Sequence, residues 1–476
     1  MMATTRNRSA RLETTSRYRT IMVTYGAAAA IAWGALAFGA VYPWAFAPLL
    51  AASFALGVAS HLIAPPGAGV NWPLAAALGT VAMSCLIQLV PLRAETLAWV
   101  SPAADRLLRE YDLLYAHASG NDRVHSISIN PKETWLGLVF LAVYAVLLLG
   151  LARIFSRREI DRLAGIVATL GATLAVIAIV QRATSTGKVY GFWTPLMGKD
   201  PFGPFVNRNH FAGWMLMGLP LSIGLFCGLV ARGMRGVDAG WRNRLLWFSS
   251  PDASRILLVG FAVVIMGLSL ILTLSRSGIA CLAAVFLLTG LFAARKQGGR
   301  SERVIIGGYL MFVAAIAVSW AGVDAIIKRF ADPATRDLSG RLPIWADTIQ
   351  IIRDFPLVGT GLNTYGTATL FYQRTLPNAH LAEAHNDYLQ LAAEGGWLVG
   401  LPIAVAAVVF VRQVYRRFRS ESDEPIAYWI RAGAVAGLAG IALQSVAEFS
   451  LQLPGNAVLF VALCAIALHR APARPV

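Results

Sequence analysis

Runs of about 20 mainly apolar residues recur along the whole chain and are separated by polar connections. In lipid, every backbone polar group must be paired within its own segment, so such runs favour membrane-spanning helices. The pattern predicts about twelve spans, at residues 20–40, 43–64, 73–91, 135–152, 162–181, 210–231, 255–274, 277–294, 303–323, 396–412, 428–447 and 454–469. Since the alternating pattern of a membrane barrel is absent, we expect an all-α polytopic membrane protein.

Three polar connections are long enough to carry structure of their own, at residues 92–134, 182–209 and 324–395. The first predicts a short amphipathic helix followed by a polar loop. The third and largest predicts a helix over 342–355, a turn at 359–363, and a second helix over 381–394 that leads into the tenth span. The chain therefore divides into a basic arm (1–19), nine spans (20–323), a large loop (324–395), and three spans with a tail (396–476).

Composition supports this division. Of the 476 residues, 57% are hydrophobic and 14% are charged, whereas soluble proteins have about 25% charged residues. The four cysteines all lie in apolar runs and form no CxxC pair, so neither a disulfide framework nor a zinc site is indicated.

The basic residues are unevenly distributed. The net charge of +16 would suggest nucleic-acid binding in a soluble protein. Here the basic residues gather in the N-terminal arm, in the tail and in the connection after every second span. These segments together hold 25 of the 41 Lys and Arg, whereas they hold only 9 of the 25 Asp and Glu. Because basic connections stay in the cytoplasm, we expect both termini to be cytoplasmic, the long loops to face outward, and no nucleic-acid partner. The first span is interpreted as a signal anchor.

One histidine in the large loop is a candidate for proton transfer. His385 precedes the tenth span in the string HNDY, where an imidazole can accept a proton near neutral pH. An interfacial histidine with a structural hydrogen bond is the alternative interpretation. The spacing of His380 and His385 does not place both on one helical face, so a metal site is not expected.

Three arginines lie at or near outward span ends: Arg208, Arg276 and Arg341. A guanidinium group binds phosphate through two parallel hydrogen bonds and keeps its charge in a poorly solvated place. Contact with lipid phosphates is the alternative explanation for each. P-loop, Rossmann, HExxH and Asp-x-Asp motifs are all absent, so we expect neither a cofactor nor a metal.

Five strings resemble the O-antigen ligase/polymerase superfamily: GPFVNRNHFAG at 203–213, LSRSG at 274–278, SGRLPIW at 339–345, FPLVGTGLN at 355–363 and HNDYLQLAAEGG at 385–396. The resemblance implies a bacterial inner-membrane glycosyltransferase, similar to the GT-C type, that uses an undecaprenyl-diphosphate-linked glycan in the periplasm. It implies His385 as the catalytic base and Arg208, Arg276 and Arg341 as diphosphate-binding residues. Further candidates are Asn207, His210, His380, Asn386, Asp387 and Tyr388.

The resemblance leaves the acceptor open between a second lipid-linked glycan, a lipid A core and a protein hydroxyl. Nine residues separate Asn386 from Gly396, as in the ligase pattern, but Gly396 and Gly400 are one residue further apart than the glycine pair of that pattern, which favours a polymerase. A flippase and a chain-length regulator are further expected partners, beside membrane lipids. A lipid-linked oligosaccharide transporter and a non-catalytic assembly component remain alternatives.

Overall fold

Helices make up almost all of the regular structure in the residues that the computed structural model describes. These are residues 2–64, 68–118, 122–184, 187–195, 200–233, 251–295, 307–308, 311, 337–374, 380–419 and 425–469. The helices are α1 (Met2–Leu36), α2 (Pro43–Ile63), α3 (Trp72–Gln88), α4 (Ala94–Val100), α5 (Pro102–Tyr111), α6 (Leu113–His117), α7 (Pro131–Ile154), α8 (Arg157–Thr184), α9 (Arg208–Gly233), α11 (Pro251–Leu272), α12 (Arg276–Arg295), α15 (Asp337–Asp354), α16 (Tyr365–Tyr372), α17 (Asp387–Phe418), α18 (Pro425–Gln444) and α19 (Pro454–Leu468), with 3-10 turns η1 (Phe38–Ala40) and η4 (Ser450–Gln452).

Seven helices within these ranges are long and apolar enough to cross a membrane: α2, α7, α8, α9, α11, α17 and α18. Three shorter apolar helices, α3, α12 and α19, coincide with further predicted spans. Most of the predicted span 303–323 lies outside the described residues, so the number twelve stays a prediction. The described helices agree with the predicted all-α polytopic membrane protein.

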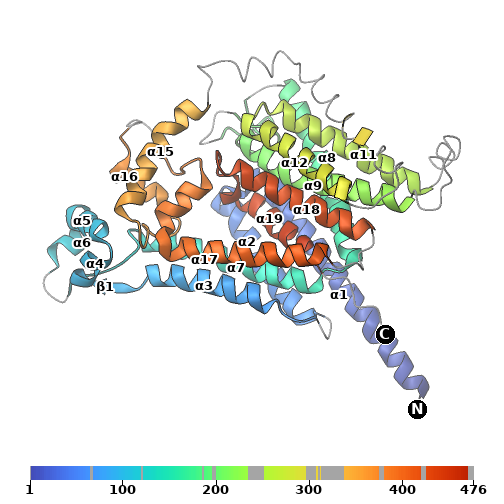
Figure 1. Cartoon of the computed structure of the whole chain (residues 1–476), viewed down its shortest axis with the longest axis horizontal. Coiled ribbons are helices and arrows are strands. Elements are labelled where there is room, and N and C mark those ends of the chain that lie inside the picture. The colour runs from blue at the N-terminus through green and yellow to red at the C-terminus, as the bar shows by residue number, and fades with distance from the viewer. Residues whose placement is uncertain are drawn as a thin grey trace.

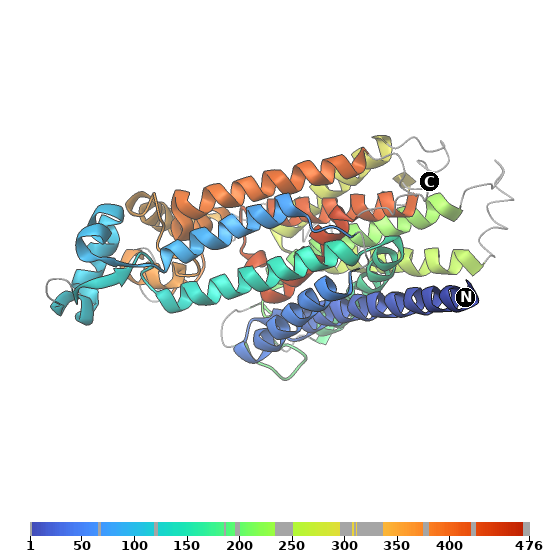
Figure 2. The same cartoon turned by 90° about the horizontal axis from the view of Figure 1, so that it is seen from below.

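Helix α9 is the centre of the bundle, because every residue from His210 to Ala231 is buried. Helices α8, α11, α12 and α18 surround it. Gly224 and Gly433 allow α9 and α18 to approach closely, since a Cβ on either would lie within 2.4 Å of a backbone oxygen of the other helix. Close contact through small residues is the usual way in which helices associate in lipid. On the opposite flank α17 packs against α3, and α3 packs against α7 (Figures 1 and 2).

The small helices gather at one end of the bundle, where α4–α6 lie near α15 and α16 (Figure 1). Buried residues of the first and third long connections share one core there, including Leu97, Leu108, Ile351 and Phe355. A two-stranded antiparallel ribbon, β1 (Pro91–Arg93) with β2 (Val124–Ser126), closes the first connection. Residues 92–134 thus form three short helices and a ribbon strand, where one helix and a loop were predicted.

The predicted helix over 342–355 is present as α15, but the predicted start of the next helix at Leu381 is wrong. Residues 381–386 are not helical, and α17 begins at Asp387. Backbone groups of this segment bond to other elements instead: Thr369 Oγ1 donates to the Leu381 oxygen (2.7 Å), and Trp345 Nε1 to the Ala384 oxygen (3.0 Å). These tertiary bonds replace the helical ladder.

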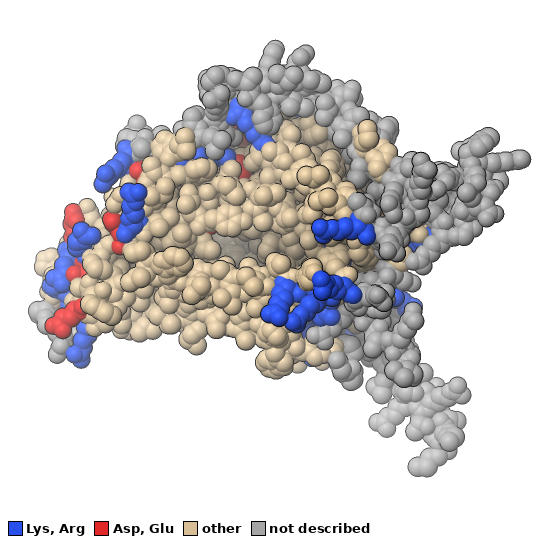
Figure 3. Space-filling model, viewed as in Figure 1, with Lys and Arg blue, Asp and Glu red and all other residues tan. Residues whose placement is uncertain are grey.

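Charged side chains differ between the two ends of the bundle. On the face in Figure 3, acidic and basic residues mix at the end of α4–α6 and α15, and the broad middle is nearly free of charge. At the other end the visible charges are basic. This distribution follows the charge pattern read from the sequence.

Candidate active site

The backbone at His385 is held in an unusual conformation. Its φ angle is 50°, in the left-handed region that costs an ordinary residue roughly 1–2 kcal/mol. The segment is fixed on both sides, because Trp345 bonds to the Ala384 oxygen and the Asp387 nitrogen donates to the Ser445 oxygen (2.9 Å). Strained backbone that the surroundings hold in place is concentrated at functional sites.

The His385 ring faces a buried carboxylate. Glu448, in the connection between α18 and η4, is fully buried, and its Oε1 accepts a hydrogen bond from Arg341 Nη2. Its Oε2 lies 3.8 Å from His385 Nδ1. Both of these facing atoms are buried and have no hydrogen-bond partner among the described residues. A small approach would let Nδ1–H donate to Oε2, and catalytic hydrogen bonds commonly tighten in this way when substrate binds.

A second histidine reaches the same place from α9. The Phe449 ring is 4.8 Å from the His385 ring and 4.6 Å from the His210 ring, with interplanar angles of 81° and 76°. His210 is buried, and neither of its ring nitrogens has a hydrogen-bond partner in the described part of the chain. The structure therefore brings two of the predicted site residues to one aromatic ring.

The first turn of α9 is tied to the C-terminal helices through backbone oxygens. The Asn209 oxygen accepts from Gln444 Nε2 (3.2 Å) and Ser450 Oγ (3.4 Å). The His210 oxygen accepts from Asn456 Nδ2 (3.2 Å). The string that begins α9 is thus fixed by η4 and by the ends of α18 and α19, which flank Glu448 in the sequence.

Arg208 lines a cavity of about 230 Å³ with Arg182, Asp200 and Thr273. Its Nη2 lies 3.5 Å from Asp200 Oδ2, but that carboxylate is 61% exposed, so the pair is weak. Arg276 begins α12 three residues after Thr273. The first turns of α9 and α12 meet, since a Cβ on Gly278 would be 2.9 Å from that of Ala212. Both arginines therefore start helices at the same end of a packed pair.

Five further predicted residues have structural contacts. Asn386 Oδ1 accepts from the Tyr388 and Leu389 nitrogens and caps α17. Asp387 Oδ1 accepts from Gln452 Nε2 (2.9 Å), and Tyr388 donates to the Ala442 oxygen (2.8 Å). Asn207 Oδ1 accepts from the Asn209 nitrogen at the start of α9 (2.8 Å). His380 is exposed, and its Nε2 lies 2.7 Å from the Gly366 oxygen, where it anchors the loop.

The glycine turn at 359–363 clamps the large loop onto α17. Glu394 is buried, and its carboxylate accepts from the Asn363 nitrogen (2.8 Å), the Tyr365 nitrogen (3.0 Å) and Gln390 Nε2 (3.1 Å). Gly359 has a φ of 67°, and a Cβ there would lie 2.1 Å from the Glu394 oxygen. This motif positions the His385 segment and supplies no reactive group of its own.

Glu448 and Phe449 were not predicted from the sequence. A signal was present, because Glu448 is the only acidic residue after Glu424 and lies in a short connection between two apolar runs. An ionisable residue in such a place favours a functional role.

A further carboxyl group lies in the same loop. Burial raises the pKa of Glu383, and the nearby His385 and His380 partly offset that rise. Glu383 is thus an alternative proton acceptor. In the described ranges, no group of three or more His, Cys, Asp or Glu side chains is placed to hold a metal ion.

Residues 261–404 match the family described as O-antigen ligase. This match and the relative described next confirm the resemblance to the O-antigen ligase/polymerase superfamily that was drawn from the sequence. Among curated proteins it is similar to the exopolysaccharide production protein ExoQ of Rhizobium meliloti (strain 1021), with 26% identity over 248 residues. The alignment covers 49% of this chain and 51% of that relative, so the chain matches about half of the relative's length.

Proposed function

We propose that this protein transfers glycan from an undecaprenyl-diphosphate carrier to an acceptor hydroxyl, at the periplasmic face of the inner membrane, in surface polysaccharide biosynthesis. The observation that carries the proposal is the pairing of His385 Nδ1 with the buried Glu448 Oε2, in a chain whose residues 261–404 match O-antigen ligase. The similarity to an exopolysaccharide production protein supports a role in surface polysaccharide biosynthesis. Within that role we favour a polymerase over a ligase that uses a lipid A core, because the spacing of Gly396 and Gly400 departs from the ligase pattern.

In the proposed reaction, the acceptor oxygen bonds to the anomeric carbon as the bond from that carbon to the carrier diphosphate breaks. His385 Nε2 takes the hydroxyl proton, while Glu448 orients the ring through Nδ1 and stabilises the imidazolium that forms. The diphosphate leaves with the electron pair and gains negative charge. Arginine side chains stabilise that charge without proton transfer.

The cavity beside Arg208 supports a place for the diphosphate, because Arg182 also lines it and Arg276 starts the adjoining helix. Arg341 is a third candidate for diphosphate contact, and its bond to Glu448 gives it a second role in fixing the carboxylate. Arg182 is added to the residues predicted from the sequence.

The test uses purified protein, a lipid-diphosphate oligosaccharide and acceptor, with products separated by gel and identified by mass spectrometry. We expect His385→Ala to lower transfer by about 10²–10⁴-fold, the usual contribution of a positioned base. His380→Ala is the matched control, since this exposed histidine of the same loop contacts a backbone oxygen. Glu383→Gln removes the alternative acceptor and should leave transfer near wild type.

A ladder of whole repeat units would establish a polymerase, and a single transfer that requires lipid A core would establish a ligase. Near-wild-type transfer by folded His385→Ala would contradict the assignment of the base. If the folded wild-type protein transfers no lipid-linked glycan, the transporter or assembly alternative replaces the proposal.

A further inference from the structure

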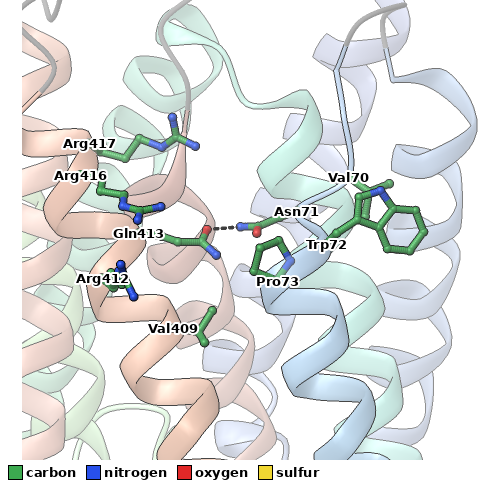
Figure 4. A pocket seen from close by; sticks show the side chains of 9 residues that line it. All are labelled: Val70, Asn71, Trp72, Pro73, Val409, Arg412, Gln413, Arg416 and Arg417. Atoms are coloured by element: carbon green, nitrogen blue, oxygen red, sulfur yellow. Dashed lines mark hydrogen bonds between the residues drawn. The ribbon is translucent and has the colours of Figure 1, made fainter.

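A second and larger cavity lies at the other end of α17. It has a volume of about 560 Å³ and opens between the first turn of α3 and the last turns of α17 (Figure 4). Asn71 Nδ2 donates to Gln413 Oε1 and joins the two walls. Helix α17 is kinked at Gly396, and from there to Arg412 it rises by roughly 24 Å, so this cavity is remote from the candidate active site.

Three arginines line the wall formed by α17: Arg412, Arg416 and Arg417. Arg412 and Arg416 are one helical turn apart, an arrangement in which like charges repel. Neither has a hydrogen bond or an ion pair with any residue in the described ranges, and no lining residue is acidic. The helix dipole favours cations at this end, but it does not explain why they face a cavity. An anion between them would remove the repulsion.

The remaining lining is largely apolar and comes from Val70, Trp72, Pro73 and Val409. Trp72 is 71% exposed, and it begins a helix that coincides with a predicted span. Tryptophan in such a position is typical of the membrane–water interface, where its ring is in apolar surroundings and its N–H meets water. The same end of the bundle shows basic residues in Figure 3. The cavity thus combines a cationic wall with an apolar one at an expected membrane surface.

We propose that this cavity binds the headgroup of an anionic phospholipid. The phosphodiester lies between Arg412 and Arg416, and the glycerol and the first part of the acyl chains lie against Trp72 and Val409. Basic pockets between membrane helices are suited to such headgroups. The proposal does not depend on glycan transfer, because it uses only the end of α17 away from His385.

The experiment uses the full chain, purified in detergent and incubated with phosphatidylglycerol, phosphatidylcholine or inorganic phosphate. Native mass spectrometry counts the retained lipid across a titration. We expect the wild type to retain phosphatidylglycerol in preference to phosphatidylcholine. Arg412→Gln with Arg416→Gln should weaken phosphatidylglycerol binding roughly 10- to 30-fold, as expected for two basic residues near a lipid surface. Circular dichroism and elution volume check that each variant is folded.

Two matched variants complete the design. Arg158→Gln with Arg232→Gln removes the same charge from two other exposed arginines at helix ends and should bind like the wild type. Arg412→Lys with Arg416→Lys keeps the charge and should retain most of the binding. Unchanged binding by the glutamine variant, or equal retention of phosphatidylcholine by the wild type, overturns the proposal. Competition by inorganic phosphate at equal concentration would assign the cavity to a soluble anion and also overturn it.

Discussion

Glu448 is a buried carboxylate with an arginine on one oxygen and a histidine facing the other. A buried charge of this kind is tolerated only when it is paired, and removing one partner of a buried pair typically costs about 3–5 kcal/mol. The arrangement therefore affects both stability and the orientation of the His385 ring. Substitutions can separate the two effects.

Glu448→Gln keeps the shape of the side chain and removes its charge. We expect glycan transfer to fall by about 10-fold to 10⁴-fold, because an amide neither fixes the correct tautomer of His385 nor stabilises its protonated form. A purely structural role would leave the pH profile unchanged. In the proposed role, the acidic limb of the profile moves to lower pH. Asp354→Asn, which removes a carboxylate of α15 that accepts from Tyr372 (2.7 Å), is the control and should leave the limb in place.

The pairing of Arg341 with Glu448 can be measured by a double-mutant cycle on thermal stability. Single substitutions to alanine should each destabilise strongly, and the double variant by less than their sum, with a coupling of about 0.5–3 kcal/mol. The more exposed pair of Arg255 and Asp161, whose side chains are 41% and 25% exposed, serves as comparison and should show a smaller coupling. Additive effects at Arg341 and Glu448 would exclude a stabilising pair.

At the scale of elements, the critical feature is the contact between the glycine turn and the start of α17. Gly359→Ala introduces a Cβ that would lie 2.1 Å from the Glu394 oxygen, at a φ of 67°. We expect this substitution to lower the free energy of unfolding by about 1–3 kcal/mol or more, and with it the melting temperature. Glycan transfer should also fall. Gly400→Ala, in α17, adds a Cβ with no atom within 4 Å and should leave the melting temperature nearly unchanged. Equal melting temperatures for the two variants would contradict the clamp.

The sequence predicted α15 and the turn at Gly359 because helix and turn signals act over a few residues. It failed at Leu381–Asn386, where the pattern is compatible with a helix. Bonds from Thr369 and Trp345, both distant in the sequence from the groups that they contact, decide the conformation there. The left-handed backbone at His385 likewise depends on neighbours that no local pattern reveals.

At the scale of the whole molecule, charge and helix order define an orientation that can be tested with reporter fusions. Alkaline phosphatase is active only outside the cytoplasm, and green fluorescent protein fluoresces after cytoplasmic folding. We expect phosphatase activity for fusions after Ala118, at the end of α6, and fluorescence for fusions after Arg295, at the end of α12. Phosphatase activity at Arg295 would reverse the orientation and place His385 in the cytoplasm.

Most helices of the bundle could be predicted from the sequence, because the length and apolar composition of each run are enough to indicate a membrane-spanning helix. Which runs meet could not be predicted. Arg341, His385 and Glu448 come from three separate elements, and His210 joins them from a fourth. These side chains come together only because of how α9, α18 and α19 pack, and a single sequence does not indicate which helices pack against each other.

The distribution of these residues has a consequence for protein engineering. The matched region, 261–404, contains Arg276, Arg341 and His385, whereas His210 and Glu448 lie outside it. A chimera that grafts only this region onto a relative would move the histidine and separate it from its native carboxylate. Transferring the whole cluster between such proteins therefore requires that α9 and the connection from α18 to α19 be transplanted together with the loop.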